Sequence, residues 1–183
     1  MADKNSILKD YQKDNEIRKQ QFEILRKDLL LLAGFDPQDP DLLTLTGSRK
    51  SGLAYYESDF DCAFIGEDFG DLDKKRNQLI AVADKFPKEW NFKNITTKTG
   101  LPWVPISNVV FGAETPNPLI TKLDVTFRLR KIHDQIQNHV EKQLPIQFPT
   151  DESKLQYIME IEKAFHSNDM ERYQNLKSWL KVL

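Results

Sequence analysis

The chain has 183 residues, a net charge of −2 and a hydrophobic content of 39%. This length fits one domain with a sizeable core. The near-neutral charge provides no global basic field of the kind that recruits long nucleic acids. The single cysteine, Cys62, excludes an intramolecular disulfide framework and is expected to be a core thiol.

Hydrophobic segments give no indication of a membrane protein. The longest apolar run covers residues 29–33, far fewer than a membrane span requires. The N-terminal residues lack the apolar stretch of a secretory signal peptide. We therefore expect a cytoplasmic protein without membrane association, and the oligomeric state stays open.

Helical and strand patterns together predict a mixed α/β (α+β) fold with a small central sheet and helices at both ends. An imperfect apolar stripe marks the first helix, which Gly34 and Pro37 end. We expect a loop over residues 112–121. The elements predicted in chain order are a helix at 6–32, strands at 42–46 and 59–65, a helix at 71–86, strands at 90–97, 103–111 and 122–129, and helices at 135–143, 151–165 and 168–183.

The same patterns predict helix caps and domain limits. Asp71 is expected to cap the helix that follows it, and Asn168 with Glu171 has the spacing of a capping box. Residues 1–145 are expected to form the core and its N-terminal helix. Residues 146–183 are expected to form a helical appendage packed on the sheet through Phe148 and the apolar side chains that follow it, within a single domain.

A Gly-Ser turn followed by two cations ends the first predicted strand. Gly47 permits close approach to the backbone, and the Ser48 hydroxyl can bind a phosphate oxygen. Arg49 and Lys50 carry charges suited to a polyphosphate. Alone, such a short motif is more typical of an ordinary polar turn whose basic residues face solvent.

Two aspartates lie at the start of the second predicted strand. Asp59 and Asp61 are two residues apart, so their side chains project from one face. Two adjacent carboxylates repel each other in a strand, and a bound Mg²⁺ would remove that conflict. The alternative is a loop aspartate beside an edge-strand charge.

A third acid lies in the predicted strand 122–129. Leu123, Val125 and Phe127 alternate with polar residues, which places Asp124 on the opposite face. If this strand neighbours the strand of Asp59, three carboxylates share one face and can bind metals or accept a proton. A strand with one solvated face is the alternative explanation.

In combination these residues resemble the nucleotidyltransferase superfamily that includes DNA polymerase beta, and above all its minimal and antibiotic-modifying members. Residues 43–66 carry most of the resemblance, and residues 122–129 fit it loosely through Asp124. The family pattern is a Gly-Ser turn, a loop, an Asp-x-Asp pair and a later acid. The matching positions in the first segment are Gly47, Ser48, Arg49, Gly52, Ala54, Ser58, Asp59 and Asp61.

The resemblance implies transfer of a nucleoside monophosphate from an NTP, with ATP the expected donor, to an acceptor hydroxyl. Two Mg²⁺ ions would be bound by Asp59, Asp61 and Asp124, and Asp124 would also assist the acceptor. The donor nucleotide would be held at Gly47, Ser48, Arg49, Lys50 and Ser58. The fold would be of the polymerase beta type.

Three readings of function stay open within these patterns. The first is the active enzyme, whose acceptor is a small molecule or a protein, with nucleic acid less favoured by the charge. The second is an inactive or regulatory module that binds a nucleotide or a partner. The third assigns the acids to a structural Ca²⁺. Tyr55 and Tyr56, between the motifs, can stack on a base or pack the loop.

Overall fold

A mixed sheet with flanking helices makes up the part of the chain that the computed structural model describes, namely residues 4–82, 85, 93–96, 106–107, 112–114, 119–120 and 122–180. The predicted mixed α/β class is confirmed. The elements in chain order are α1 (Lys4–Leu32), β1 (Thr44–Leu45), α2 (Gly47–Ser51), β2 (Phe60–Gly66), α3 (Phe69–Ile80), β3 (Lys93–Thr96), β4 (Ile106–Ser107), β5 (Gly112–Glu114), β6 (Lys122–Leu129), α4 (Arg130–Gln147), α5 (Asp151–His166), α6 (Met170–Leu176) and the 3-10 helix η2 (Ser178–Leu180).

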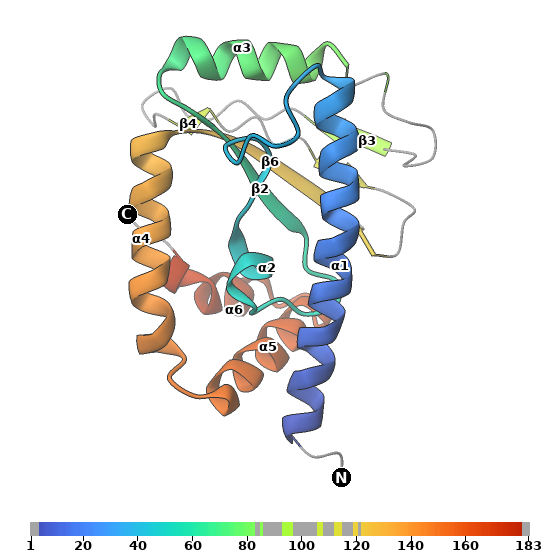
Figure 1. Ribbon diagram of the computed structural model, residues 1–183. Helices are drawn as coiled ribbons and strands as arrows, with labels where there is room; N and C mark the ends of the chain where they lie inside the picture. The colour runs from blue at the N-terminus through green and yellow to red at the C-terminus, as the bar shows by residue number, and fades with distance from the viewer. Residues whose placement is uncertain are drawn as a thin grey trace.

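The sheet is organised around two long strands, β2 and β6. They pair in parallel, and the strand order is β1-β2-β6-β5-β3. The other pairings are antiparallel, and both β4 and β5 pair with β6, at its C-terminal and N-terminal halves respectively. Figure 1 shows β2 and β6 in the centre of the molecule, between α1 and α4.

One face of the sheet forms the main core. The alternation predicted for β6 is confirmed, because Leu123, Val125 and Phe127 are each at most 2% exposed. Cys62 lies on the same side and is fully buried, as expected for a core thiol. Apolar side chains of α1 and α3 cover this face. The acids of β2 and β6 are therefore left on the opposite face.

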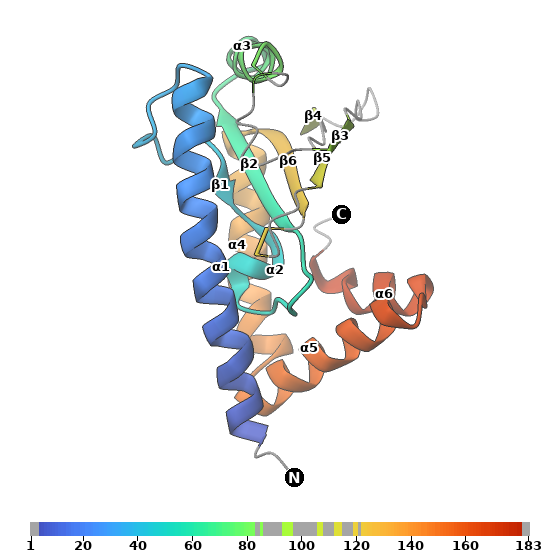
Figure 2. The same cartoon turned by 90° about the vertical axis from the view of Figure 1, so that its right-hand side faces the viewer.

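The C-terminal helices form a second core on α1 and not on the sheet, which corrects the expected docking surface. Phe148 and the buried side chains of α5 pack with Leu8 and Tyr11 of α1 and with Leu53 and Tyr55 of the loop after α2. Figure 2 shows α5 and α6 at the end of the molecule where β2 begins. This packing brings α6 close to the predicted site.

Both predicted helix caps were wrong in position. Asp68, and not Asp71, caps α3 by accepting a hydrogen bond from the Asp71 backbone. Asp169, and not Asn168, caps α6, with Arg172 as the donor. In each case an aspartate close to the predicted cap has a backbone conformation that lets its carboxylate accept the capping hydrogen bond. Residue spacing alone does not reveal that conformation.

Other element limits differ from the predictions in instructive ways. The expected loop 112–121 contains β5, whose short stretch is held by pairing with β6. The weakly patterned helix 135–143 extends to all of α4, which runs through the expected boundary at residue 145 and contains Pro145. The strands predicted at 90–97 and 103–111 include β3 and β4, and the rest of both ranges lies outside the described residues. Within the described residues, no helix is long and apolar enough to cross a membrane.

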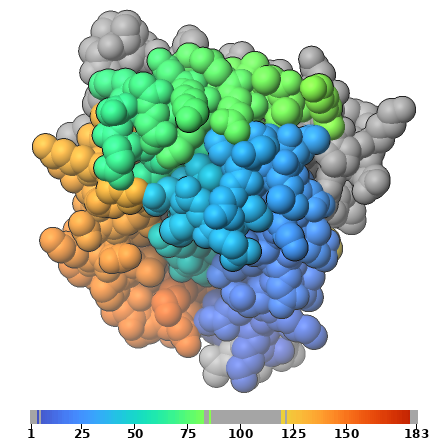
Figure 3. Space-filling view, turned by 45° about the horizontal axis from the view of Figure 1, so that its top comes forward, coloured from blue at the N-terminus to red at the C-terminus, as the bar shows by residue number. Residues whose placement is uncertain are grey.

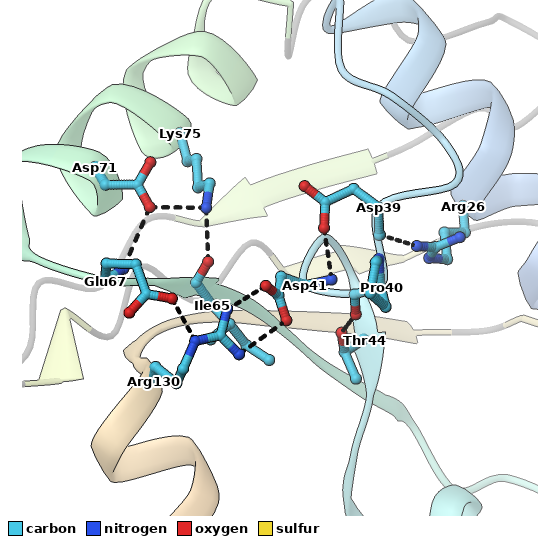
Figure 4. A network of polar contacts seen from close by, with 10 residues as sticks. All are labelled: Arg26, Asp39, Pro40, Asp41, Thr44, Ile65, Glu67, Asp71, Lys75 and Arg130. Carbon is cyan, nitrogen blue, oxygen red and sulfur yellow. Dashed lines mark hydrogen bonds and ion pairs between the residues drawn. The ribbon is translucent and has the colours of Figure 1, made fainter.

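A charged network holds together the end of the sheet remote from the acids (Figure 4). Arg130, at the start of α4, donates hydrogen bonds to the carboxylates of Asp41 and Glu67. The Asp41 carbonyl accepts from the Ile65 backbone at 2.7 Å, and Lys75 of α3 donates to the Ile65 carbonyl at 2.7 Å. The network thus joins β2, α3, α4 and the segment before β1.

An arginine of α1 binds three backbone carbonyls of the segment between α1 and β1. Arg26 donates to the backbone carbonyls of Pro37 at 2.9 Å, Asp39 at 2.7 Å and Leu42 at 2.9 Å. Figure 3 shows this segment as a continuous surface with α1 and α3. Its fixed path determines where β1 enters the sheet.

Replacement of Arg130 tests the network. We expect Arg130→Met to lower the free energy of unfolding by about 1 kcal/mol, because two partly exposed carboxylates lose a shared guanidinium. The loss should shrink at high salt, which screens exposed ion pairs. Urea unfolding at low and high salt measures both effects. The neighbouring exposed Lys131→Met is the control, and an equal loss in both variants would contradict the assignment.

Candidate functional site

The parallel pairing of β2 and β6 brings the three predicted acids together. Asp61 and Asp124 are directly opposite each other in the register. Phe60 is opposite Leu123, so Asp59, just before β2, comes beside Lys122 at the start of β6. The predicted neighbourhood of the two acidic strands is therefore confirmed.

The Gly-Ser turn lies against one of these acids. β1 pairs with β2, and the Thr46 backbone donates a hydrogen bond to the Asp61 carbonyl at 2.7 Å, which places Gly47 next to the Asp61 side chain. A Cβ at position 47 would lie 2.2 Å from Asp61 Oδ2. Gly47 also has a φ of +65°, which side chains rarely adopt. Both the close contact with Asp61 and the positive φ therefore require glycine at position 47.

Lys122 occupies the space between two of the acids and was not among the predicted site residues. Its Nζ lies 3.0 Å from Asp59 Oδ2 and 2.9 Å from Asp124 Oδ2. The side chains of both acids are mostly buried, with 24% and 19% exposed. The sequence could have indicated Lys122, because it lies two residues before Asp124 in the predicted strand and therefore on the same face.

Burial and the charges of the cluster shift the pKa values of Asp59 and Asp61 in opposite directions. Burial alone would raise the pKa of Asp59, but the attraction and hydrogen bond of Lys122 hold it below its ordinary value. Burial and the neighbouring charge of Asp59 raise the pKa of Asp61 to about 6. Asp61 therefore holds a proton more readily than Asp59 does.

Two further cations reach the cluster from distant parts of the chain. Lys177, directly after α6, interacts electrostatically with Asp59 and Asp61, and its Nζ lies 4.6 Å from the centre of the Tyr173 ring. Arg128, at the end of β6, interacts with Asp61 and is largely buried, which lowers its pKa. Neither was predicted as a site residue. The alternation of β6 places Arg128 on the face of Asp124, whereas Lys177 reaches the cluster only in the folded chain.

A cavity of about 430 Å³ opens beside Asp61 between α2, the end of β6 and α4. Lys50 borders it and donates to Gln137 Oε1 at 2.6 Å. Among the described residues, two buried polar atoms of its wall, Thr46 Oγ1 and Arg128 Nη1, have no hydrogen-bond partner. The full lining is Thr46, Gly47, Lys50, Ser51, Asp61, Arg128, Ile136, Gln137, Val140, Glu141 and Leu144.

Arg49 does not border this cavity, which corrects its expected role as a phosphate ligand. The residue is 1% exposed, and its guanidinium donates to the carbonyls of Tyr56 at 3.1 Å and Ser58 at 2.6 Å and to Asn15 Oδ1 at 3.2 Å. It also lies 4.7 Å from the centre of the Phe60 ring. Burial lowers its pKa to about 10. Arg49 therefore positions the loop that leads to Asp59.

The remaining predicted residues of the motif also serve the loop. Ser58 is buried, and its hydroxyl accepts a hydrogen bond from the Tyr55 backbone at 3.1 Å. Tyr55 is buried, and Tyr56 stacks on Tyr11 at 4.6 Å between ring centres, so both tyrosines pack the loop. Ser48 lies in α2 and does not line the cavity. Of the expected donor-binding residues, Gly47 and Lys50 border the cavity.

The acids have the right chemistry for a hard divalent ion, which prefers carboxylate oxygens. Asp124 Oδ1 is buried without a hydrogen-bond partner, and the Oδ2 atoms of Asp59 and Asp124 converge on one point. That point is held by the ammonium of Lys122. As arranged here, no three acidic, histidine or cysteine side chains among the described residues form a ready metal site.

Comparison of the chain with protein-family models, with curated proteins and with solved structures finds no match. The chemistry of the site therefore follows from its own residues. It offers three clustered carboxylates, flanking cations and an adjoining cavity.

Replacement of Gly47 tests the contact with Asp61. We expect Gly47→Ala to lower the free energy of unfolding by more than roughly 2 kcal/mol, because the new Cβ clashes with the carboxylate. Gly52→Ala is the matched control, since Gly52 has a φ of +73° but nothing within 4 Å of a Cβ. Gly52→Ala should lower the free energy of unfolding by only about 1 kcal/mol, the cost of placing an alanine in a left-handed backbone conformation. Equal losses in denaturant unfolding would contradict the clash.

The raised pKa of Asp61 predicts a pH-dependent gain in stability for Asp61→Asn without metal. The native state keeps this proton to a higher pH than the unfolded chain, so its ionisation costs stability as pH rises from about 4 to about 6. The asparagine removes that cost, and the gain should be roughly 1–3 kcal/mol above about pH 6 and small near pH 4. Denaturant unfolding in EDTA across this range measures it. A gain independent of pH would refute the explanation.

Proposed function

We propose that the protein is a Mg²⁺-dependent nucleotidyltransferase of the DNA polymerase beta type. The observation that carries the proposal is the direct opposition of Asp61 and Asp124 on neighbouring parallel strands, with Gly47 against Asp61. A Gly-Ser turn beside clustered carboxylates is what the sequence resemblance implies for this class. A supporting feature is the cavity that begins at Asp61.

The roles of the residues follow from what each can offer a nucleotide. Lys50 and Arg128 border the cavity and can bind phosphate oxygens, and Arg128 Nη1 has a free donor there. Bound magnesium would neutralise the phosphates at Asp59, Asp61 and Asp124. The acceptor oxygen forms the new bond to the α-phosphorus while the bond to pyrophosphate breaks. Asp124 is suited to take the acceptor proton.

The acceptor is best sought among small molecules and proteins. The chain carries a net charge of −2, and long nucleic acids generally need a basic groove. The apolar side chains Ile136, Val140 and Leu144 on one wall of the cavity suit a base or another flat apolar group.

Label transfer tests the proposal. With [α-³²P]ATP and Mg²⁺, we expect the wild-type protein to label an acceptor or itself, and Asp59→Asn to lower the rate by roughly a thousandfold or more, because the carboxylate cluster that would attract the phosphate-neutralising Mg²⁺ loses one of its charges. Asp73→Asn is the control, since Asp73 is 59% exposed on α3 and pairs with Arg76. It should label as the wild type does.

The second candidate, a module that binds nucleotide without transfer, is favoured by the ammonium that occupies the acid cluster. This module would bind ATP in a filter or calorimetric assay without labelling any acceptor. Equal labelling by wild type and Asp59→Asn would refute the metal-dependent transfer. Binding without labelling, by both proteins, would favour the second candidate.

A further inference from the structure

The sheet holds the backbone of Lys122 beside the acid cluster. It is the first residue of β6, and its backbone is held in register with Glu114 of β5 on one side. On the other side the parallel pairing brings Asp59 beside it. Its side chain projects to the same face as Asp124, two residues later. Strand register thus places the Lys122 backbone beside the acids, and its half-exposed side chain reaches both of them.

The contacts of Lys122 are those of a bound cation. Its Nζ bridges one oxygen of Asp59 and one of Asp124 at 3.0 and 2.9 Å. Each of these oxygens belongs to a mostly buried carboxylate, which needs a positive partner. A divalent ion shared by the two acids would occupy the same space. The ammonium and such an ion exclude each other.

The charges of the cluster lead to the same conclusion. Three carboxylates, Asp59, Asp61 and Asp124, are matched by Lys122 in direct contact and by Lys177 and Arg128 through their electrostatic interactions. A divalent ion between Asp59 and Asp124 would add positive charge where these two carboxylates already share the Lys122 ammonium. Asp61, which borders the cavity, is the acid that Lys122 does not contact.

We propose that the Lys122 ammonium takes the place of one of the two metal ions that the family resemblance implies, so that the cluster binds a single divalent ion, at Asp61. The inference deepens the proposed function and rests on its metal requirement. Lys122 is then a positioning residue, which keeps Asp59 and Asp124 together in the metal-free protein. A permanent cation there also spares the site the need to capture a second ion.

A count of bound Mn²⁺ tests the proposal without nucleotide or acceptor. Electron paramagnetic resonance of free Mn²⁺ during titration should give one ion per chain for the wild type and two for Lys122→Met. Lys74→Met is the matched control, because Lys74 is exposed on α3 at the remote end of the sheet, and it should bind one. Two ions on the wild type, none on it, or an unchanged count for Lys122→Met would each overturn the proposal.

Thermal unfolding in EDTA provides a second readout that follows charge and not packing. Lys122→Met leaves three carboxylates short of one counter-charge, so its Tm should fall by roughly 5 °C and recover with Mn²⁺. The double variant Lys122→Met/Asp124→Asn removes a charge of each sign and should regain most of the loss in EDTA. A loss that the double variant does not recover would show that Lys122 acts through packing.

The metal count still tests the role of Lys122 if a variant is unstable or if the protein has no transferase activity. If Lys122→Met does not fold without metal, the ions are counted by mass spectrometry on protein purified in Mn²⁺, with the same expected number of two. Absence of label transfer together with one ion on the wild type and two on the variant would refute the proposed function alone. Label transfer with two ions on the wild type would refute the role of Lys122 alone.

Discussion

The parallel register of β2 and β6 is the constraint on which the site depends. It places Asp61 opposite Asp124 and brings Asp59 beside Lys122. A shift of one residue would turn one set of these side chains to the core face, where Cys62 and Val125 are buried. The apolar alternation that fills the core therefore also holds the acids in place. Stability and site geometry are determined by the same pairing.

Around this pairing, two residues near the Gly-Ser turn act in different ways. Gly47 allows Asp61 to approach by having no side chain, whereas Arg49 works from inside the core. Its guanidinium gathers the carbonyls of the loop that ends at Asp59 and reaches Asn15 of α1. A buried charge is costly unless it is fully hydrogen-bonded, and these contacts provide that compensation. The motif is thus part scaffold and part binding surface.

Much of the fold could be predicted from the sequence, because its patterns are local. The strand 122–129 was predicted with its observed limits, and α1 and α5 were predicted within a few residues. The errors occurred where a tertiary contact decided the outcome. β5 is too short to be recognised without its partner β6. α4 begins directly after β6 and continues through Pro145, where the sequence predicts a boundary. The caps of α3 and α6 went to acids whose backbone shape the sequence does not reveal.

The sequence by itself determined most of the elements, the buried face of β6 and the identity of the three acids, since side-chain alternation and residue type are read directly from the chain. Only the tertiary structure decided which charges meet them. Lys122, Lys177 and Arg128 come from a strand start, a helix end and a strand end, and they converge because the sheet register and the packing of α6 bring them there. Arg49 lies away from the expected binding surface for the same reason, because its hydrogen-bond partners come together only when α1 packs against the loop.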